Sequence, residues 1–263
     1  MNVYKRVLTI AGSDSGGGAG IQADIKTISA CGCYAASAIT AITAQNTIGV
    51  QVIEPMSGSL VEQQICSVLD DIGANAIKIG MLGSTDVARA VARTLLRYSV
   101  QNVVLDPVLV ATSGDELSVK GVIDVIVNEL MPLCSIITPN LIEAERLTGS
   151  ICVEKVWTYL SERGCRGLLL KGGHKEPNAG MITDFLVDDK GIQTFVNEWI
   201  ITPNTHGTGC SLSSSVAAFL AHGLDLNESV ERAEKYLHQA LATAADYSLG
   251  HGAGPVHHFY KFW

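Results

Sequence analysis

A glycine-spaced turn, Asn204-Thr205-His206-Gly207-Thr208-Gly209-Cys210, precedes an apolar segment of small residues that we expect to be helical as far as His222. Backbone N–H groups at such a helix start bind a phosphate or stabilise a developing phosphoryl charge. Cys210 would lie in the first turn, where the helix dipole lowers a thiol pKa. The resulting thiolate could accept a proton from an attacking hydroxyl. A buried, purely structural cysteine is the alternative interpretation.

A second glycine-rich segment runs from Gly12 to Gly20 directly after the first apolar run. Residues 18–23 match the relaxed dinucleotide pattern G-x-G-x-x-A, but no acid for a ribose follows about 20 residues later. A phosphate loop of the G-x-x-x-x-G-K-[ST] type is absent, because the chain has no Gly-Lys dipeptide. A simple tight turn remains an alternative. Asp14 and Asp24 flank the segment, and Asp24 in an early helical turn could be a surface acid that favours the helix dipole.

The segment Thr138-Pro139-Asn140-Leu141-Ile142-Glu143 has two interpretations. Asn140 can cap a helix, and Glu143 three residues later completes a capping-box arrangement. Glu143 could instead lie near a phosphate-bound Mg²⁺, which takes few carboxylates and keeps several waters. The sequence alone leaves both roles open.

Further polar residues follow apolar runs and could join the same site. Asp106 ends one run and is suited to face phosphates, while Lys171 ends another, within Lys171-Gly172-Gly173-His174. Gln45 follows the apolar run from Ala35 to Ile42, and its amide can donate and accept hydrogen bonds together. That pairing would match an amino group beside a ring nitrogen, although an isolated glutamine is usually a surface residue.

The elements that must position these residues alternate along the chain. Short apolar runs bounded by Gly, Pro or Asn predict buried strands, and the stretches between them predict helices. This alternation indicates an α/β fold with a mostly parallel sheet covered on both faces, and ligands then bind at the carboxyl ends of the strands. We expect one domain over residues 1–263, with strands at 6–10, 74–79, 102–106, 134–138 and 167–171, helices at 19–30, 60–69, 85–98, 119–130, 151–163, 210–222 and 226–247, and a hairpin of 181–187 with 192–195.

Composition excludes several classes. The chain of 263 residues is 47% hydrophobic and 17% charged, which argues against disorder. A net charge of −8 argues against a nucleic-acid or anionic-membrane surface. There is no long uncharged apolar run for a membrane span and no signal-peptide core near the start, so we expect a cytoplasmic protein. Seven cysteines without a C-x-x-C pair are expected to be reduced.

Taken together, the motifs resemble those of the hydroxymethylpyrimidine/phosphomethylpyrimidine kinases, the thiamine-biosynthesis branch of the ribokinase-like superfamily. The similarity covers the whole chain, with the motifs in the same order. It rests on the segments 11–24, 45–47, 78–82, 105–108, 138–143, 171–174 and 204–210, and on a C-terminal Gly-His-rich segment, 250–258.

The resemblance implies a three-layer α/β/α ribokinase-like fold, a homodimer, ATP and Mg²⁺. It implies two transfers, first to 4-amino-5-hydroxymethyl-2-methylpyrimidine and then to its monophosphate. The same resemblance assigns the acceptor pocket to Gly12, Asp24, Gln45, Met81, Val108 and Cys210, the nucleotide to Asn140, Lys171 and Thr208, Mg²⁺ to Glu143 and Asp106, and the transition state to Gly207, Thr208 and Gly209.

Other functions remain possible at this point. A pyridoxal or pyridoxine kinase differs only in the acceptor ring, and some aminopyrimidine kinases carry Glu at the position of Gln45. A sugar kinase is disfavoured because Cys210 stands where those enzymes carry Asp, and a dinucleotide-dependent oxidoreductase because the ribose acid is missing. A thiol hydrolase would need a base beside Cys210, for which His206 is the near candidate in sequence. A non-catalytic binding protein is disfavoured because the motifs of both substrate sides are intact.

Overall fold

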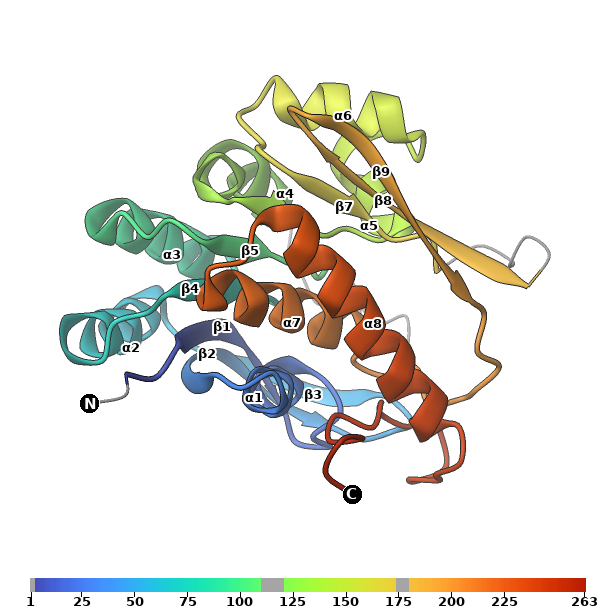
Figure 1. The fold of residues 1–263 in the computed structure, drawn as a ribbon. Coiled ribbons are helices and arrows are strands. Elements are labelled where there is room, and N and C mark those ends of the chain that lie inside the picture. The colour runs from blue at the N-terminus through green and yellow to red at the C-terminus, as the bar shows by residue number, and fades with distance from the viewer. Residues whose placement is uncertain (1–2, 110–120, 174–179) are drawn as a thin grey trace.

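The computed structural model describes residues 3–109, 121–173 and 180–263. Within these residues, nine strands form a single sheet in the order β3-β2-β1-β4-β5-β6-β7-β8-β9 (Figure 1). The strands are β1 (Arg6–Asp14), β2 (Tyr34–Gln45), β3 (Val50–Pro55), β4 (Ala76–Ile79), β5 (Val103–Leu105), β6 (Ile136–Ile137), β7 (Leu168–Leu170), β8 (Met181–Asp188) and β9 (Gly191–Glu198).

The six neighbouring strands β2, β1, β4, β5, β6 and β7 are parallel, and both edges of the sheet are antiparallel. β3 pairs antiparallel with β2 at one edge, and the hairpin of β8 and β9 closes the other edge. The expected strands and hairpin are therefore confirmed, whereas β3 was not expected. The apolar run at 35–42 became β2, which lies between β3 and β1.

Helices cover both faces of the sheet, which confirms the three-layer α/β/α fold (Figure 1). α1, α7 and α8 pack on one face, and α2, α3, the turns after α4, and α6 pack on the other. Their bounds are α1 (Gly20–Ala30), α2 (Gly58–Asp71), α3 (Thr85–Tyr98), α4 (Val122–Val125), α5 (Leu141–Thr148), α6 (Val153–Ser161), α7 (Thr208–His222) and α8 (Leu226–Ala244).

The strands are apolar throughout because both of their faces are buried. Successive side chains of a strand point to opposite faces. In β5, Val104 packs with the α7 and α8 side, whereas Val103 and Leu105 pack with the α3 side. The same alternation divides Ile136 and Ile137 of β6. A run of consecutive apolar residues therefore supplies both cores, as a parallel sheet between two helical layers requires.

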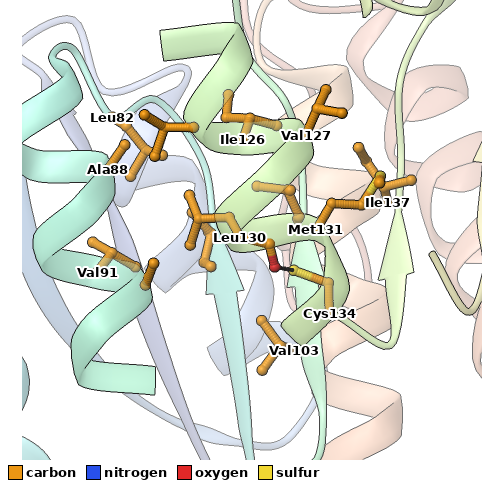
Figure 2. Close-up of a cluster of buried hydrophobic side chains, with 14 of the residues drawn as sticks. Leu82, Ala88, Val91, Val103, Ile126, Val127, Leu130, Met131, Cys134 and Ile137 are labelled. Atoms are coloured by element: carbon orange, nitrogen blue, oxygen red, sulfur yellow. Dashed lines mark hydrogen bonds between the residues drawn. The ribbon is translucent and has the colours of Figure 1, made fainter. Parts of the chain in front are cut away.

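The segment after α4 differs from the expected helix 119–130. α4 is one short turn, followed by a π-helical turn at Ile126–Leu130 and a 3₁₀ turn at Met131–Leu133, and residues 119–120 lie outside the described part of the chain. Figure 2 shows that Leu130 and Met131, which are adjacent in sequence, both point into the core between α3 and the sheet. The wider π turn brings these large side chains to the same core, and the thiol of Cys134 donates a hydrogen bond to the Leu130 carbonyl oxygen over 3.2 Å.

The remaining helices begin and end close to the expected positions. α6 is shorter than the expected 151–163, and α8 stops at Ala244 rather than Tyr247. Among the described residues, none of the helices combines the length and apolar character that crossing a membrane requires.

Candidate active site

The carboxyl ends of the parallel strands open into a cavity of about 860 Å³, completed by the N-terminus of α7 and one side of α8. This position follows the general rule for open α/β sheets. Twelve of the thirteen predicted site residues line it, and Asp24 does not. The twelve are Gly12, Gln45, Met81, Asp106, Val108, Asn140, Glu143, Lys171, Gly207, Thr208, Gly209 and Cys210.

The N-terminus of α7 projects into this cavity. Gly207 is the N-cap with φ of 78°, a left-handed conformation that favours glycine. A side chain at Gly207 would overlap the carbonyl oxygen of Gly18, so glycine is required for the two loops to touch. Gly209 faces the charged side of the cavity, and a Cβ there would lie 3.2 Å from Nζ of Lys171. The first turn of α7 can therefore present N–H groups and a cation to one anion.

The first glycine-rich segment has a different function from the one its pattern suggested. The carboxylate of Asp14 accepts hydrogen bonds from the backbone N–H groups of Gly16, Gly18 and Ala19, over 2.8, 3.0 and 2.8 Å. It also accepts one from Nε2 of His206 over 2.9 Å. These N–H groups point inward to Asp14 and so are not free to cradle a pyrophosphate. Although burial opposes it, the His206 and backbone hydrogen bonds hold the pKa of Asp14 below its ordinary value.

Lys171 and Asp106 form the charged centre of the site. Nζ of Lys171 donates to Oδ1 of Asp106 over 3.0 Å, with side-chain exposures of 12% and 2%. Burial alone would raise the pKa of Asp106, but the ammonium groups of Lys171 and Lys78 hold it below the usual range. Burial likewise opposes the charge of Lys171, and the carboxylates of Asp106 and Glu143 raise its pKa. At neutral pH the site thus holds a fixed cation beside a fixed anion.

Glu143 makes the capping box and also lines the cavity. Its carboxylate accepts from the Asn140 N–H over 2.8 Å, and the Asn140 side chain accepts from the Glu143 N–H over 2.9 Å. Burial is the main cause that raises the pKa of Glu143 to about 7, with the charge of Asp106 adding to it and Lys171 opposing it. A cation between Glu143 and Asp106 would relieve this like-charge repulsion.

Cys210 lies at the cavity wall but its environment corrects one expectation. We expected the helix dipole to lower the thiol pKa. Burial instead raises the pKa of Cys210 to about 11, and the charges of Asp24 and Asp106 act in the same direction against Lys78. The thiol is therefore neutral at pH 7 in this state, because the loss of solvent outweighs the nearby positive charge.

Asp24 is fully buried beneath the site rather than exposed on its helix. Both of its oxygens accept from Nζ of Lys78 over 2.9 Å, and the hydroxyls of Thr9 and Ser214 donate to it over 2.6 and 2.7 Å. The alternative interpretation of Asp24 as a surface acid is wrong, because this helix face packs against β1 and α7. Lys78 was missing from the predicted site residues, although a lysine inside the apolar run of β4 signals a buried partner.

Gln45, Met81, Gly12 and Val108 also line the cavity. A Cβ at Gly12 would lie 2.8 Å from Cε of Met81, so the end of the methionine side chain would have to shift. The Gln45 side-chain nitrogen lies 3.4 Å from Nε2 of His206, and its oxygen accepts from Thr43 Oγ1 over 3.2 Å. His206 thus links the glycine-rich loop to Gln45, a contact that the sequence did not indicate.

One wall of the cavity was not foreseen from the sequence. It is formed by residues from β8, β9, α8 and the segment after β9. Its apolar members are Ile182, Trp199, Ile201, Leu237 and Leu241, and its polar members include Asp184, Asn197 and Glu234. No local sequence pattern marks these residues, because they meet only when α8 packs across the hairpin of β8 and β9.

Two expectations bear on metals and on the lysine segment. In the described part of the chain, no three His, Cys, Asp or Glu side chains are grouped so that they could hold a metal ion. Glu143 and Asp106 could supply two carboxylate ligands. Two are enough for Mg²⁺ when phosphate and water molecules complete its coordination shell. His174 of the predicted segment 171–174 lies outside the described residues.

Comparisons with known proteins agree with this geometry. The model of the phosphomethylpyrimidine kinase family matches residues 14–257. The hydroxymethylpyrimidine/phosphomethylpyrimidine kinase of Rhizobium meliloti is 44% identical over 262 residues, covering 97% of both chains. A thiamine biosynthesis bifunctional protein of Geobacter sulfurreducens is 45% identical over 96% of this chain and 52% of its own length. The Bacillus subtilis pyridoxal kinase, solved as an ADP complex, superposes with a TM-score of 0.88 at 33% identity, covering 97% of both chains.

Proposed function

The chain belongs to the phosphomethylpyrimidine kinase family, and we propose that it phosphorylates 4-amino-5-hydroxymethyl-2-methylpyrimidine and then the resulting monophosphate, for thiamine biosynthesis. It is a kinase, and ATP is its co-substrate. The observation that carries the proposal is that Cys210, the α7 N-terminus and the Lys171–Asp106 pair meet in one cavity, which Gln45 also lines. Such a cavity brings an acceptor ring and a phosphate group together.

The nucleotide phosphates would lie over the N-terminus of α7. Lys171 and the N–H groups of the turn from Gly207 to Gly209 supply the positive charge that a transferring phosphoryl group needs. Asn140 is beside this position, and Thr208 is the first residue of α7. The apolar wall of Trp199, Leu237 and Leu241 would suit the nucleotide base.

Mg²⁺ would be held between Glu143 and Asp106. The fit rests on their carboxylate chemistry and on the pKa of Glu143, which burial raises to about 7 with the charge of Asp106 adding to the effect. When bound, the ion would neutralise charge on the phosphate oxygens. Asp106 also accepts a hydrogen bond from Lys171. The phosphate would therefore be held by Lys171 and by the metal ion together.

The acceptor ring would lie near Gln45, Met81, Val108 and Gly12. In the first transfer the hydroxymethyl oxygen attacks the terminal phosphorus, the bond to ADP breaks, and the hydroxyl proton leaves. Cys210 is placed to receive that proton once its own thiol proton has been lost. In the second transfer the attacking phosphate oxygen already carries charge, so it needs little help from a base. Asp24 would act on this end indirectly, through Lys78 and Ser214.

A homodimer, a cytoplasmic location and a single domain over the chain also belong to the proposal. The resemblance to the kinase family implies the dimer, and exposed apolar side chains at β2, β3 and the turn between them offer a surface for it. Ile42, Ile48 and Val52 are 50%, 68% and 58% exposed. Sedimentation of the purified chain would test the dimer.

A pyridoxal kinase activity is the second candidate, favoured by the structural similarity to the Bacillus subtilis enzyme. An ADP-release assay with hydroxymethylpyrimidine, its monophosphate and pyridoxine as acceptors separates the two. We expect the highest kcat/KM with the first two acceptors. A higher kcat/KM with pyridoxine, or no turnover of the monophosphate, would reject the proposed substrate.

A further inference from the structure

Two acidic side chains in the cavity wall have no role in the proposed transfer. Asp184 on β8 is 7% exposed, and Glu234 on α8 is 5% exposed. Their carboxyl groups lie close enough to couple, since after burial the charge of Asp184 is the next cause that raises the pKa of Glu234. Both line the cavity of the active site.

Each carboxyl group also accepts from one fixed donor. Oδ1 of Asp184 accepts from the backbone N–H of Gly172 over 2.6 Å. Oε2 of Glu234 accepts from Nδ2 of Asn197 over 3.1 Å. The remaining oxygen of Glu234, Oε1, is buried and receives no hydrogen bond from a donor in the described part of the chain. A proton on this oxygen, directed at Asp184, satisfies both groups, whereas two facing carboxylates would repel each other.

The surrounding charges are consistent with a shared proton. Lys171 from the end of β7 is the cation that faces the pair, and His238 on α8 and Glu198 on β9 line the same cavity. Burial is the main cause that raises the pKa of both carboxyl groups, and the charge of Asp184 adds to the effect on Glu234. Lys171 acts in the opposite direction but does not outweigh burial.

The pair is attached to the turn that carries Lys171. Gly172 follows Lys171 directly, and a Cβ at Gly172 would overlap the carbonyl oxygen of Thr183. The turn is therefore pressed against β8, and its N–H is fixed by Asp184. Glu234 extends this connection to α8, since its carboxyl group couples to Asp184 and accepts a hydrogen bond from Asn197 of β9. A change at Glu234 can therefore reach the lysine through Asp184 and the Gly172 N–H.

We propose that Glu234 is a positioning residue that shares one proton with Asp184 and thereby holds the Lys171–Gly172 turn against the phosphate site. The positioning role of Glu234 rests on the proposed kinase reaction. The shared proton does not, because it is present in the protein before any substrate binds.

The first experiment detects the proton directly. Infrared spectroscopy of the wild-type protein at neutral pH should show the stretch of protonated carboxyl groups, and the intensity of this band should fall in Glu234→Gln. The part that remains belongs to Glu143, whose pKa is about 7. Glu231→Gln is the matched control, because Glu231 lies on the same helix but is exposed and paired with Lys235. A wild-type spectrum without the band, or a band of equal intensity in Glu234→Gln, would overturn the shared proton.

The second experiment measures the pH dependence of stability. A carboxyl group with a raised pKa in the folded state contributes stability at low pH that is lost as the pH rises through that pKa. Glutamine can donate to Asp184 and accept from Asn197 without a proton to lose. As the pH is raised above the ordinary pKa of a glutamate, the wild-type Tm should therefore fall relative to the Tm of Glu234→Gln. Parallel Tm curves for the two proteins would contradict the proposal.

The third experiment tests positioning. Glu234→Ala leaves Asp184 without its partner, and we expect kcat/KM for ATP to fall by about 10-fold to 100-fold, the scale of an ångström-sized misplacement. Glu234→Gln should restore activity at neutral pH and should lose less activity than the wild type at alkaline pH. Equal losses in the Ala and Gln variants would reject the positioning role. If the protein proved to phosphorylate a different substrate, the infrared band and the Tm curves would still test the shared proton.

Discussion

Nζ of Lys171 donates a hydrogen bond to Oδ1 of Asp106 over 3.0 Å, and both groups lie beside Gly209 in the first turn of α7. The pair joins the end of β7 to the end of β5 directly above the helix N-terminus. A phosphate bound there meets the helix dipole, a fixed cation and a carboxylate that can share a metal ion. The predictions below follow from this arrangement and from the groups packed around it.

A methyl group at position 209 should damage the phosphate site without unfolding the protein. In Gly209→Ala the Cβ would lie 3.2 Å from Lys171 Nζ and 3.6 Å from Asp106 Oδ2, so the lysine must shift. We expect kcat/KM for ATP to fall about 10-fold or more, in the range of losses at electrostatic sites, with Tm unchanged. Gly207→Ala is the contrasting variant, because its φ of 78° and its contact with Gly18 make it lower Tm. Wild-type kinetics in Gly209→Ala would rule out this phosphate site.

The two roles of Glu143 can be separated by Glu143→Gln. Glutamine can still accept from the Asn140 N–H, so the loss of capping stability should stay under about 1 kcal/mol. The carboxylate that would bind Mg²⁺ is lost, and we expect a higher Mg²⁺ concentration for half-maximal activity. Thermal unfolding and Mg²⁺ titration of the activity provide the measurements. A drop in Tm with full activity at the wild-type Mg²⁺ concentration would leave Glu143 as a cap alone.

Cys210→Ala should distinguish the two transfers. A base contributes about 10²–10⁴ in rate, and the first acceptor is a neutral hydroxyl, whereas the second is a phosphate that already carries charge. We expect the variant to slow the first transfer far more than the second, with ATP affinity retained. Equal slowing of both transfers would mean that Cys210 shapes the pocket, and no slowing would reduce it to a buried apolar residue.

The pH dependence of the first transfer gives a separate test of Cys210. Its thiol pKa is about 11, so between pH 7 and 9 the thiolate fraction should increase about tenfold per pH unit. The rate of the first transfer should rise with pH over this range, and the second should not rise in parallel. Cys210→Ala should remove the slope. Stopped single-turnover assays with each acceptor would measure it, and a slope that survives in the variant would assign the titration to another group.

Removal of one partner from the buried ion pair of Asp24 and Lys78 should destabilise the protein strongly. Asp24→Asn leaves the ammonium group of Lys78 buried without a counter-charge, and removal of one partner from such a pair costs about 3–5 kcal/mol. Urea unfolding should show this loss. The control is Glu228→Gln, which breaks an exposed pair with Arg232, and exposed pairs contribute under about 1 kcal/mol. Similar losses in both variants would show that solvent reaches Lys78.

The sequence alone determined the fold class and the position of the site. Apolar runs such as 102–106 and 134–138 predict strands buried on both faces, and the helical stretches between them leave only a parallel sheet with two helical layers. Ligands bind at the carboxyl ends of such strands, so residues that end an apolar run, such as Asp106 and Lys171, were expected near one another. The glycine-spaced turn at 207–209 was expected at a helix start for the same local reasons. The capping box of Asn140 and Glu143 was also readable, because both partners lie within one turn.

The tertiary structure decided what these residues experience. Asp24 and Ser214 are 190 positions apart, and Asp14 and His206 are 192 apart, so no local pattern could pair them. The pKa of Cys210 depends on how much solvent α7 excludes, and the sequence shows only that a helix begins nearby. Lys78, Asp184 and Glu234 became part of the site or its support only when distant elements buried them. Burial sets the free energy of a charge, and burial is a property of the packed chain rather than of any segment.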